Sequence, residues 1–224
     1  MIIAIDGPAG AGKSTIAKLI AKRFDIVYID TGAMYRAIGL KALRNGIKCT
    51  DDDKISEMLA STDINLANGN GILSVYLDGE DVSRAIRQPE ISKMASDISA
   101  VPQVRYAMVD MQRKLAAGTD TVLDGRDIGT FVLPNADCKI FLTASVDERA
   151  RRRCKELSER GENVTLEQVK NDIIQRDYND SHRKLAPLKK AEDAVEIDST
   201  GLTIEEVCDK IAAIIKGKTT EKSI

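Results

Sequence analysis

A glycine-rich loop between a short apolar run and a helical pattern constrains this chain more than any other feature. Residues 2–5 are apolar and mostly β-branched, which is typical of a buried strand. Residues 7–14, Gly-Pro-Ala-Gly-Ala-Gly-Lys-Ser, match the pattern G-x-x-x-x-G-K-[ST] in full. Beyond the loop, Ile16, Leu19 and Ile20 recur at helical spacing. A strand, a loop and a helix in this order predict a phosphate-binding P-loop.

The residue types of this loop suit a polyphosphate. Glycines allow backbone N–H groups to converge on the anion, and the helix that begins near Lys13 points its positive end at it. Lys13, which we expect on an exposed loop, supplies a charge for the outer phosphates, and the Ser14 hydroxyl can bind Mg²⁺. A plain strand–turn–helix would use the glycines but would not need the Lys-Ser pair.

Composition excludes several function classes. The chain has 224 residues and a formal net charge of -2, so it carries no basic footprint for nucleic acid. No apolar run approaches a membrane span, and no basic segment precedes an apolar one as in a signal peptide. The single histidine, His182, leaves little for a histidine metal cluster or a Ser-His-Asp site. We therefore expect a protein that binds neither nucleic acid nor a membrane. We also expect a cytoplasmic monomer, although nothing in the composition fixes the oligomeric state.

Four more apolar runs follow the first, with helical patterns between them, at residues 26–30, 121–124, 139–142 and 194–197. Five such strands predict an α/β fold with a five-stranded parallel sheet flanked by helices. Ligands of such sheets bind at the carboxyl ends of the strands, where Gly7–Ser14, Asp30-Thr31 and Asp124–Asp127 lie. We expect Thr31 to cap the helix that follows it.

Residues 63–83 have a different texture. Asn-Gly and Asp-Gly pairs separate short apolar runs there, which predicts a three-stranded antiparallel meander. We place this meander in an insert that reaches about residue 110, within a core formed by residues 1–62 and 84–216. The polar tail, residues 217–224, is expected to be disordered.

Arginines gather where a second phosphate site would lie. Arg126 follows a core strand and a glycine at the sheet edge where the P-loop opens, which favours ligand contact over a solvated position. Two helical stretches carry such groups on one face, Arg149 with Arg153, and Arg176 with Asp180 and Arg183. Guanidinium groups suit phosphate oxygens and offset charge during phosphoryl transfer.

Asp124 ends its strand as a carboxylate beside the P-loop strand. That position suits a carboxylate that holds Mg²⁺, often through water, and a helix-capping aspartate is the alternative. We therefore predict a magnesium site that uses Ser14 and Asp124.

Four segments in this order resemble the bacterial cytidylate kinase family: GPAGAGKST, IDTGAMYR, LDGRDIGTFVLP and QRDYNDSHRKLAPL. The resemblance runs from Ile2 to about Ile215, and DGRDIGT with the later R-D-x-x-D-x-x-R is far more specific than the P-loop. It implies a nucleoside monophosphate kinase fold with a core, a monophosphate-binding domain that includes the meander, and a lid within residues 147–183. The implied reaction is Mg²⁺-dependent transfer of phosphate from ATP to CMP or dCMP, giving CDP or dCDP.

The resemblance also implies roles for individual residues. ATP would be bound by Gly7, Pro8, Ala9, Gly10, Ala11, Gly12, Lys13, Ser14, Thr15 and the lid arginines Arg149 and Arg153. CMP would be bound by Thr31, Arg36, Ser96, Arg105, Arg126, Asp127, Arg176, Asp180 and Arg183, with Ser96, Arg105 and Asp127 on the cytosine. The catalytic set would be Lys13, Arg126, Arg176 and Arg183. Thr31 stands where the family usually has Ser, and Ser14 where some relatives have Gly; both changes leave or add a hydroxyl.

Two other interpretations remain open at this point. One is a P-loop kinase that acts on a different nucleotide or on a metabolite hydroxyl. The other is a nucleotide-dependent switch that binds partners, which the absence of an N-K-x-D motif makes weaker.

Overall fold

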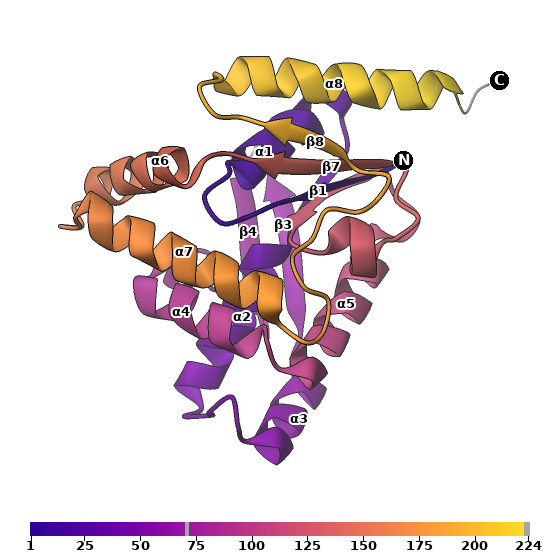
Figure 1. The fold of residues 1–224 in the computed structure, drawn as a ribbon. Helices are drawn as coiled ribbons and strands as arrows, with labels where there is room; N and C mark the ends of the chain where they lie inside the picture. Colours follow the sequence, from indigo (N-terminus) through magenta and orange to yellow (C-terminus); the bar gives the residue numbers. More distant parts are fainter. Residues whose placement is uncertain (70–71, 222–224) are drawn as a thin grey trace. The chain divides into compact units, whose positions relative to one another are not determined.

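The structure is a computed structural model that describes residues 1–69 and 72–221. It divides into a first unit, residues 1–26 with 119–224, and a second unit, residues 27–118. The strands are β1 (Ile2–Asp6), β2 (Val27–Asp30), β3 (Ile64–Gly69), β4 (Ile72–Leu77), β5 (Glu80–Asp81), β6 (Thr121–Gly125), β7 (Cys138–Thr143) and β8 (Val195–Asp198). The helices are α1 (Lys13–Phe24), α2 (Thr31–Arg44), α3 (Asp52–Ala60), η1 (Ala85–Arg87), α4 (Pro89–Ile98), α5 (Pro102–Ala116), η2 (Ile128–Val132), α6 (Val146–Glu159), α7 (Leu166–His182) and α8 (Ile204–Glu221) (Figure 1).

The predicted five-stranded parallel sheet is confirmed, with the order β2-β6-β1-β7-β8. In the first unit, β1 pairs in parallel with β6 and β7, and β7 pairs in parallel with β8. The register places Asp6 of β1 beside Gly125 of β6. The P-loop and the loop after β6 therefore leave the sheet at the same edge, where ligands of parallel sheets bind.

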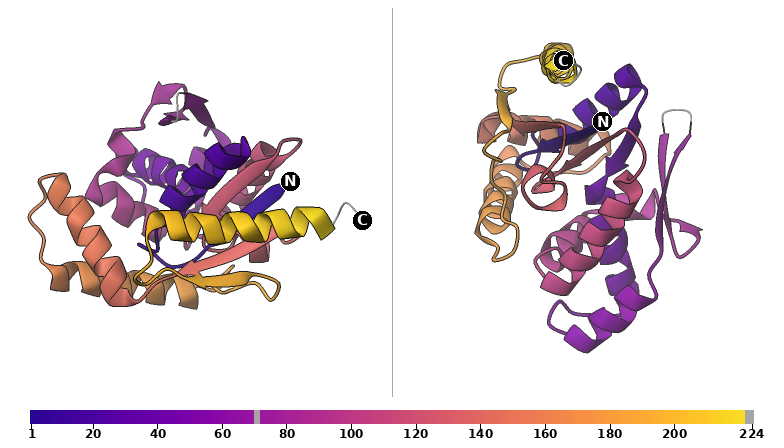
Figure 2. Two further views of the ribbon diagram at one scale, coloured as in Figure 1. Left: turned by 90° about the horizontal axis from the view of Figure 1, so that it is seen from above. Right: turned by 90° about the vertical axis from the view of Figure 1, so that its right-hand side faces the viewer.

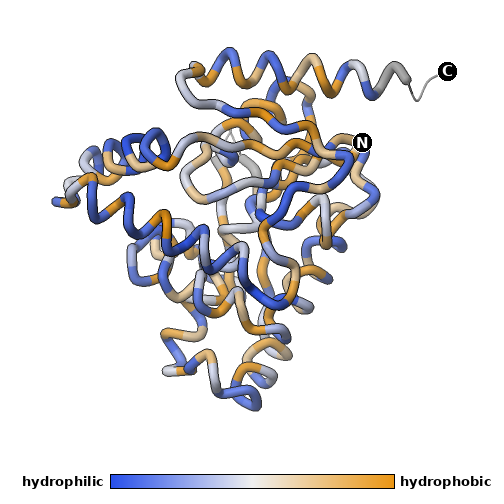
Figure 3. Tube along the Cα trace, viewed as in Figure 1, coloured by the Kyte–Doolittle hydropathy of each residue, from blue (hydrophilic) through white to orange (hydrophobic). Residues whose placement is uncertain are grey.

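Apolar side chains explain why these segments are strands. Ile3 and Ile5 of β1 and Val122 and Leu123 of β6 are fully buried, and Figure 3 shows the strands mostly in orange and α6 and α7 mostly in blue. Burying each such side chain contributes roughly 1.5–3 kcal/mol. Helix α1 packs against β6, helix α8 packs against β7, and the two helices pack against each other. Both therefore cover one face of this part of the sheet (Figure 2).

The tail prediction needs a correction. Helix α8 continues to Glu221, so residues 217–221 are helical rather than disordered, and residues 222–224 lie outside the described part. The buried stripe of α8 holds Val207, Ile211 and Ile215, and the helical hydrogen bonds carry the pattern beyond the last of them.

The second unit contains the predicted antiparallel meander, β3-β4-β5. Asp78 and Gly79 connect β4 to β5 with φ angles of 50° and 86°, both in the left-handed region that a two-residue hairpin turn requires. The expected turn at Asn70-Gly71 lies outside the described residues. Helix α2 is tied to this sheet by ion pairs from Lys41 to Asp78 (2.6 Å) and from Arg44 to Glu80 (2.6 Å).

The cap of α2 differs from the prediction. Asp30, not Thr31, is the N-cap, because the Asp30 carboxylate accepts a hydrogen bond from Ala33 N–H at 2.8 Å. Thr31 is the first helical residue and is buried. Pro102 begins α5 after the end of α4, at a position where its missing N–H costs nothing.

We predicted an insert that contains the meander at residues 63–83 and reaches about residue 110. The second compact unit is larger than this insert and spans residues 27–118. The second unit begins at Val27 and therefore takes in β2 and α2 as well as the meander.

Among residues 1–69 and 72–221, no helix combines the length and the apolar character needed to cross a membrane.

Candidate active site

Two glycines determine the path of the P-loop. Gly7 has a φ of 150°, and a Cβ there would lie 1.9 Å from the Leu142 carbonyl oxygen of β7, so only glycine fits. Gly12 has a φ of 87° and immediately precedes Lys13, the first residue of α1. The loop is therefore pressed against the sheet at its beginning and turns into the helix at its end.

Lys13 is buried, in contrast to the exposed position that the sequence predicted; only 5% of it is accessible. Its Nζ donates a hydrogen bond to the Pro8 carbonyl at 2.7 Å. Burial and the nearby charge of Arg126 lower the pKa of the Lys13 ammonium well below its ordinary value, although Asp124 and Asp180 act in the opposite direction. Holding a charged lysine here therefore costs folding free energy.

Ser14 and Asp124, the predicted metal ligands, lie together. The Ser14 hydroxyl donates to the Asp124 carboxylate at 2.7 Å. Asp124 is buried at the end of β6 and caps no helix, so the capping alternative is wrong. Within the described residues, no group of three or more His, Cys, Asp or Glu side chains could hold a metal ion.

Arg126 is held by an acidic partner from α7. Its Nε donates to Asp180 at 2.8 Å, and its other contact is with the Gly125 carbonyl at 3.3 Å. Burial acts to lower the pKa of Arg126, but the charge and hydrogen bond of Asp180 outweigh it and raise the pKa. The guanidinium therefore remains charged although it is half-buried.

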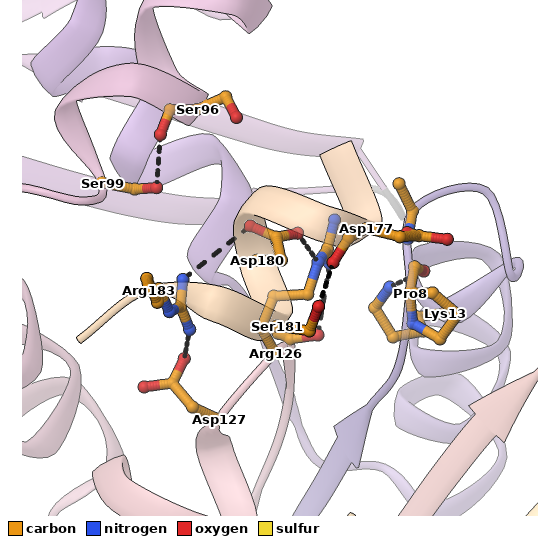
Figure 4. A network of polar contacts seen from close by, with 12 residues as sticks. Pro8, Lys13, Ser96, Ser99, Arg126, Asp127, Asp177, Asp180, Ser181 and Arg183 are labelled. Atoms are coloured by element: carbon orange, nitrogen blue, oxygen red, sulfur yellow. Dashed lines mark hydrogen bonds and ion pairs between the residues drawn. The ribbon is translucent and has the colours of Figure 1, made fainter. Parts of the chain in front are cut away.

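Arg183 makes a second buried ion pair at the end of α7. It donates to Asp127 at 3.0 Å and, through Nε, to the Ala186 carbonyl at 2.6 Å, and it lies 3.9 Å from Asp180 (Figure 4). The side chains of Arg183 and Asp127 are each only 7% exposed. Burial alone would raise the pKa of Asp180, but Arg126, Arg176 and Arg183 together hold it below its ordinary value.

The two arginines predicted to cover ATP differ in their surroundings. Arg149 is buried, donating to the carbonyls of Ala144 (2.9 Å) and Ala9 (3.0 Å) and pairing with Asp177 at 2.6 Å. Arg153 instead pairs with Glu156, three residues along the same helix, at 2.8 Å. Of these two arginines, Arg149 is the one that donates a hydrogen bond to the P-loop.

The second unit holds Thr31 and Arg36 at the start of α2. The two Asp30 oxygens have separate partners: one caps α2, and the other accepts from Arg36 at 3.3 Å. Gly32 leaves space here, because a Cβ at that position would lie 3.2 Å from both Arg36 and Asp30. The turn therefore holds the Arg36 guanidinium over the N-terminus of α2.

Ser96 and Arg105, predicted to read a base, are connected through Ser99. The Ser99 hydroxyl donates to the Ser96 carbonyl at 2.8 Å, and the Ser99 carbonyl accepts from Arg105 at 3.3 Å. Arg105 is almost fully buried at 1% exposure, and its guanidinium lies 5.7 Å from the centre of the Tyr35 ring. The Ser96 side chain itself is half-buried on α4.

Two acidic residues were missed by the sequence analysis. The carboxylate of Asp6 accepts the N–H groups of Ile128 (2.8 Å) and Gly129 (2.7 Å), which ties the loop after β6 to the strand before the P-loop. Burial raises the pKa of Asp6 to about 6, although these two hydrogen bonds oppose the shift. Asp177, the partner of Arg149, is the first aspartate of the R-D-x-x-D-x-x-R segment, and that segment was the available signal although no role was predicted for this residue.

Comparisons with known proteins agree over nearly the whole chain. A model of the cytidylate kinase family matches residues 3–217. A cytidylate kinase of Caldicellulosiruptor saccharolyticus is 56% identical over 209 residues, which cover 93% of this chain and 92% of that protein. A cytidylate kinase of Alkaliphilus oremlandii is 53% identical over 215 residues, 96% of this chain and 97% of that protein.

One solved structure shows the same fold. It belongs to an uncharacterized protein from Eubacterium ventriosum, has a TM-score of 0.54 and 15% identity, and the match covers 97% of this chain and 98% of that one. At that identity the likeness concerns the fold alone. The family match and the close relatives go further, and they show that this chain belongs to the cytidylate kinase family and is a kinase that acts on a nucleoside monophosphate.

Proposed function

We propose that this kinase transfers the γ-phosphoryl group of ATP to CMP and dCMP, giving ADP with CDP or dCDP, by direct in-line displacement. The observation that carries the proposal is a P-loop with a buried Lys13 in the same unit as the ion-paired Arg126 and Arg183. Relatives at 53–56% identity that are named cytidylate kinases support these substrates.

The residues of the chain bind and neutralise in this mechanism, and none forms a covalent intermediate. Backbone N–H groups of the P-loop and the positive end of α1 bind the phosphates of ATP. Lys13 and Arg126 offset the charge on the transferring group, and Arg176 and Arg183 hold the monophosphate in line with it. Holding both substrates makes the displacement effectively unimolecular, and closure of the lid within residues 147–183 excludes water that would hydrolyse ATP.

The pair Ser14 and Asp124 fits Mg²⁺, because a hydroxyl and a carboxylate within 2.7 Å offer the hard oxygen donors that this ion prefers. Mg²⁺ keeps several waters and binds through one or two protein groups plus substrate phosphates. When bound, the ion would neutralise charge on the phosphates of ATP.

Replacing Asp124 with asparagine is expected to raise the Mg²⁺ concentration for half-maximal activity about tenfold, since a carboxylate that orients the ion or its water is lost. Affinity for ATP in the presence of EDTA should stay within about twofold, because the Ser14 hydroxyl that donates to Asp124 can donate equally to the amide oxygen of asparagine, so the P-loop keeps this contact. The measurement is a Mg²⁺ titration of the initial rate, with calorimetry for the metal-free arm. Superimposable Mg²⁺ curves for the two proteins would leave Asp124 without a metal role.

Residues of each unit are proposed to bind CMP. In the second unit they are Thr31, Arg36, Ser96 and Arg105; in the first they are Arg126, Asp127, Arg176, Asp180 and Arg183. Arg36 and Arg126 suit the phosphate, because planar guanidiniums bind phosphate oxygens in pairs. The buried Arg105 and the Asp127 carboxylate suit the cytosine edge, since the ring nitrogen accepts and the amino group donates.

We expect CMP and dCMP to be used far better than UMP, AMP or GMP. Cytosine and uracil have one shape, but uracil presents a carbonyl where cytosine presents an amino group, so the Asp127 carboxylate would lose its donor. Asp127→Asn should narrow the CMP to UMP ratio of kcat/KM by about tenfold or more, because an amide can turn a donor toward the uracil carbonyl while its oxygen still accepts from Arg183.

The measurement is kcat/KM for CMP, dCMP, UMP and AMP with both proteins. Urea unfolding of each protein is the control, since Asp127 pairs with the buried Arg183. Equal use of CMP and UMP by the unmodified protein, or an unchanged ratio in the variant, would mean that the base is read elsewhere.

A coupled assay for ADP release across nucleoside monophosphates tests the proposed function as a whole. ADP release that depends on CMP or dCMP is the expected result. Release that depends on another acceptor would identify a different small-molecule kinase, and ATP binding without turnover on any acceptor would favour a nucleotide-dependent switch.

A further inference from the structure

Both polar groups of one P-loop residue, Ala9, are bound by an ion pair. The Ala9 N–H donates to one oxygen of Asp177 at 3.3 Å, and the Ala9 carbonyl accepts from Arg149 at 3.0 Å. The other Asp177 oxygen accepts from the same Arg149 nitrogen at 2.6 Å. Asp177, Arg149 and the peptide groups of Ala9 thus form a closed set of contacts.

Arg149 is fixed independently of this set. Its Nε donates to the Ala144 carbonyl at 2.9 Å, and its side chain is only 5% exposed. Asp177 is more accessible, with 23% of its side chain exposed. Since Arg149 cannot easily turn away, the position of Asp177 decides where the Ala9 N–H points.

The next residue of the loop is packed against the same two helices. A Cβ at Gly10 would lie 3.3 Å from the Arg149 Cβ on α6 and 3.7 Å from the Ile173 side chain on α7. Helices α6 and α7 are held together by a buried cluster of Ala150, Leu157, Val169 and Ile173. The hairpin of α6 and α7 therefore grips the P-loop at Ala9 and Gly10.

We propose that Asp177 is a positioning residue for ATP: by holding the Ala9 N–H and the Arg149 guanidinium, it fixes the first half of the P-loop against α6 and α7. The inference rests on the proposed function, since it takes the P-loop to be the ATP site. A loop held in its bound shape binds phosphate without an ordering cost, and a displacement of about 1 Å can cost about a hundredfold. Removing the Asp177 carboxylate removes the hydrogen bond to the Ala9 N–H and the ion pair with Arg149.

The test compares Asp177→Ala and Asp177→Asn with Asp172→Ala, which removes an exposed carboxylate from the same helix. We expect Asp177→Ala to raise KM for ATP, and the dissociation constant of a non-hydrolysable ATP analogue, about tenfold. KM for CMP should stay within about twofold, and Asp172→Ala should match the unmodified protein in every value. Asp177→Asn should lie between them, because its amide oxygen still accepts from Ala9 but its nitrogen cannot pair with Arg149.

Three results would overturn the inference. KM for ATP that is unchanged or lower in Asp177→Ala would mean that the loop does not need the carboxylate. Equal increases in KM for ATP and CMP, together with a lower Tm, would mean general damage and no positioning role. An unmodified protein that transfers no phosphate from ATP would overturn the proposed function and the inference with it, whereas normal turnover with either of the first two results would remove the inference alone.

Discussion

Lys13→Met is expected to lower kcat at least about a hundredfold while the free energy of unfolding stays the same or rises. Loss of one preorganised charge at the transferring group typically costs about 3 kcal/mol of transition-state stabilisation, which corresponds to that factor in rate. Stability should not fall, because burial and Arg126 lower the pKa of Lys13, which means that its charged form is disfavoured in the folded protein. Methionine keeps most of the volume of the buried chain and carries no charge.

The measurement is kcat with saturating ATP and CMP, combined with urea unfolding. Lys22→Met is the matched control, since it removes an exposed lysine from the same helix and should change neither quantity. A Lys13 variant that turns over normally would remove the P-loop lysine from the mechanism. A variant that loses activity only because it unfolds would contradict the assignment of its cost to catalysis.

Asp180→Asn is expected to cost about 3 kcal/mol of stability near neutral pH and to lower kcat/KM about a hundredfold. Asp180 accepts from Arg126 at 2.8 Å and lies 3.9 Å from Arg183, so its neutralisation leaves Arg126 without its acidic partner and removes one of the two carboxylates beside Arg183. Breaking one partner of a buried pair typically costs about 3–5 kcal/mol, and a displaced Arg126 no longer offsets charge on the phosphoryl group. Asp172→Asn, on the exposed side of the same helix, should be nearly neutral.

The pH dependence of this stability difference follows from the pKa of Asp180. The three arginines hold that pKa below its ordinary value of 3.8 in the folded protein, so the unfolded chain takes up the proton first as the pH falls. The contribution of Asp180 is therefore fully present above about pH 4–5 and is lost as the pH falls below 3.8 through the folded-state pKa. Urea unfolding should show the same difference in free energy of unfolding between the unmodified protein and Asp180→Asn at about pH 7 and pH 5, and a smaller difference at about pH 3.5. A difference that already shrinks between about pH 7 and pH 5 would contradict the assignment of this stability to the Asp180 carboxylate.

Local patterns were sufficient for the secondary structure and for the P-loop. Apolar β-branched runs such as Ile2–Ile5, the Asp78-Gly79 turn and Pro102 act through neighbouring residues, so their effect can be recognised in a short window of sequence. Helical spacing also predicted that Arg176, Asp180 and Arg183 share one helix face. Arg183 instead follows the end of α7 with an extended backbone, but the pKa of Asp180 still responds to both arginines. The prediction of a disordered tail was wrong for a related reason: a polar stretch favours disorder, but the hydrogen bonds of α8 continue to Glu221.

Depth was not accessible from the sequence. Arg149 and Arg153 are equivalent in spacing, yet Arg149 is buried against Ala9 while Arg153 pairs with Glu156 near the surface. Lys13 was expected to be exposed because it belongs to a loop motif, but it is buried and its Nζ donates to the Pro8 carbonyl of the same loop. How deeply a side chain is buried depends on how the helices and strands pack, and the sequence pattern gives only the average preference of each residue type for burial.

The sequence by itself determined the order of strands and helices, the phosphate-binding loop, and the residue types available for phosphoryl transfer, because each depends on contacts within a few residues. Only the tertiary structure decided the partners. Arg126 meets Asp180 across 54 positions and Arg183 meets Asp127 across 56. Asp6 and Asp177 hold backbone N–H groups that lie 122 and 168 positions away. Every residue except proline has a backbone N–H, so the sequence does not indicate which N–H group a carboxylate will bind. That partner is known only once the chain is folded.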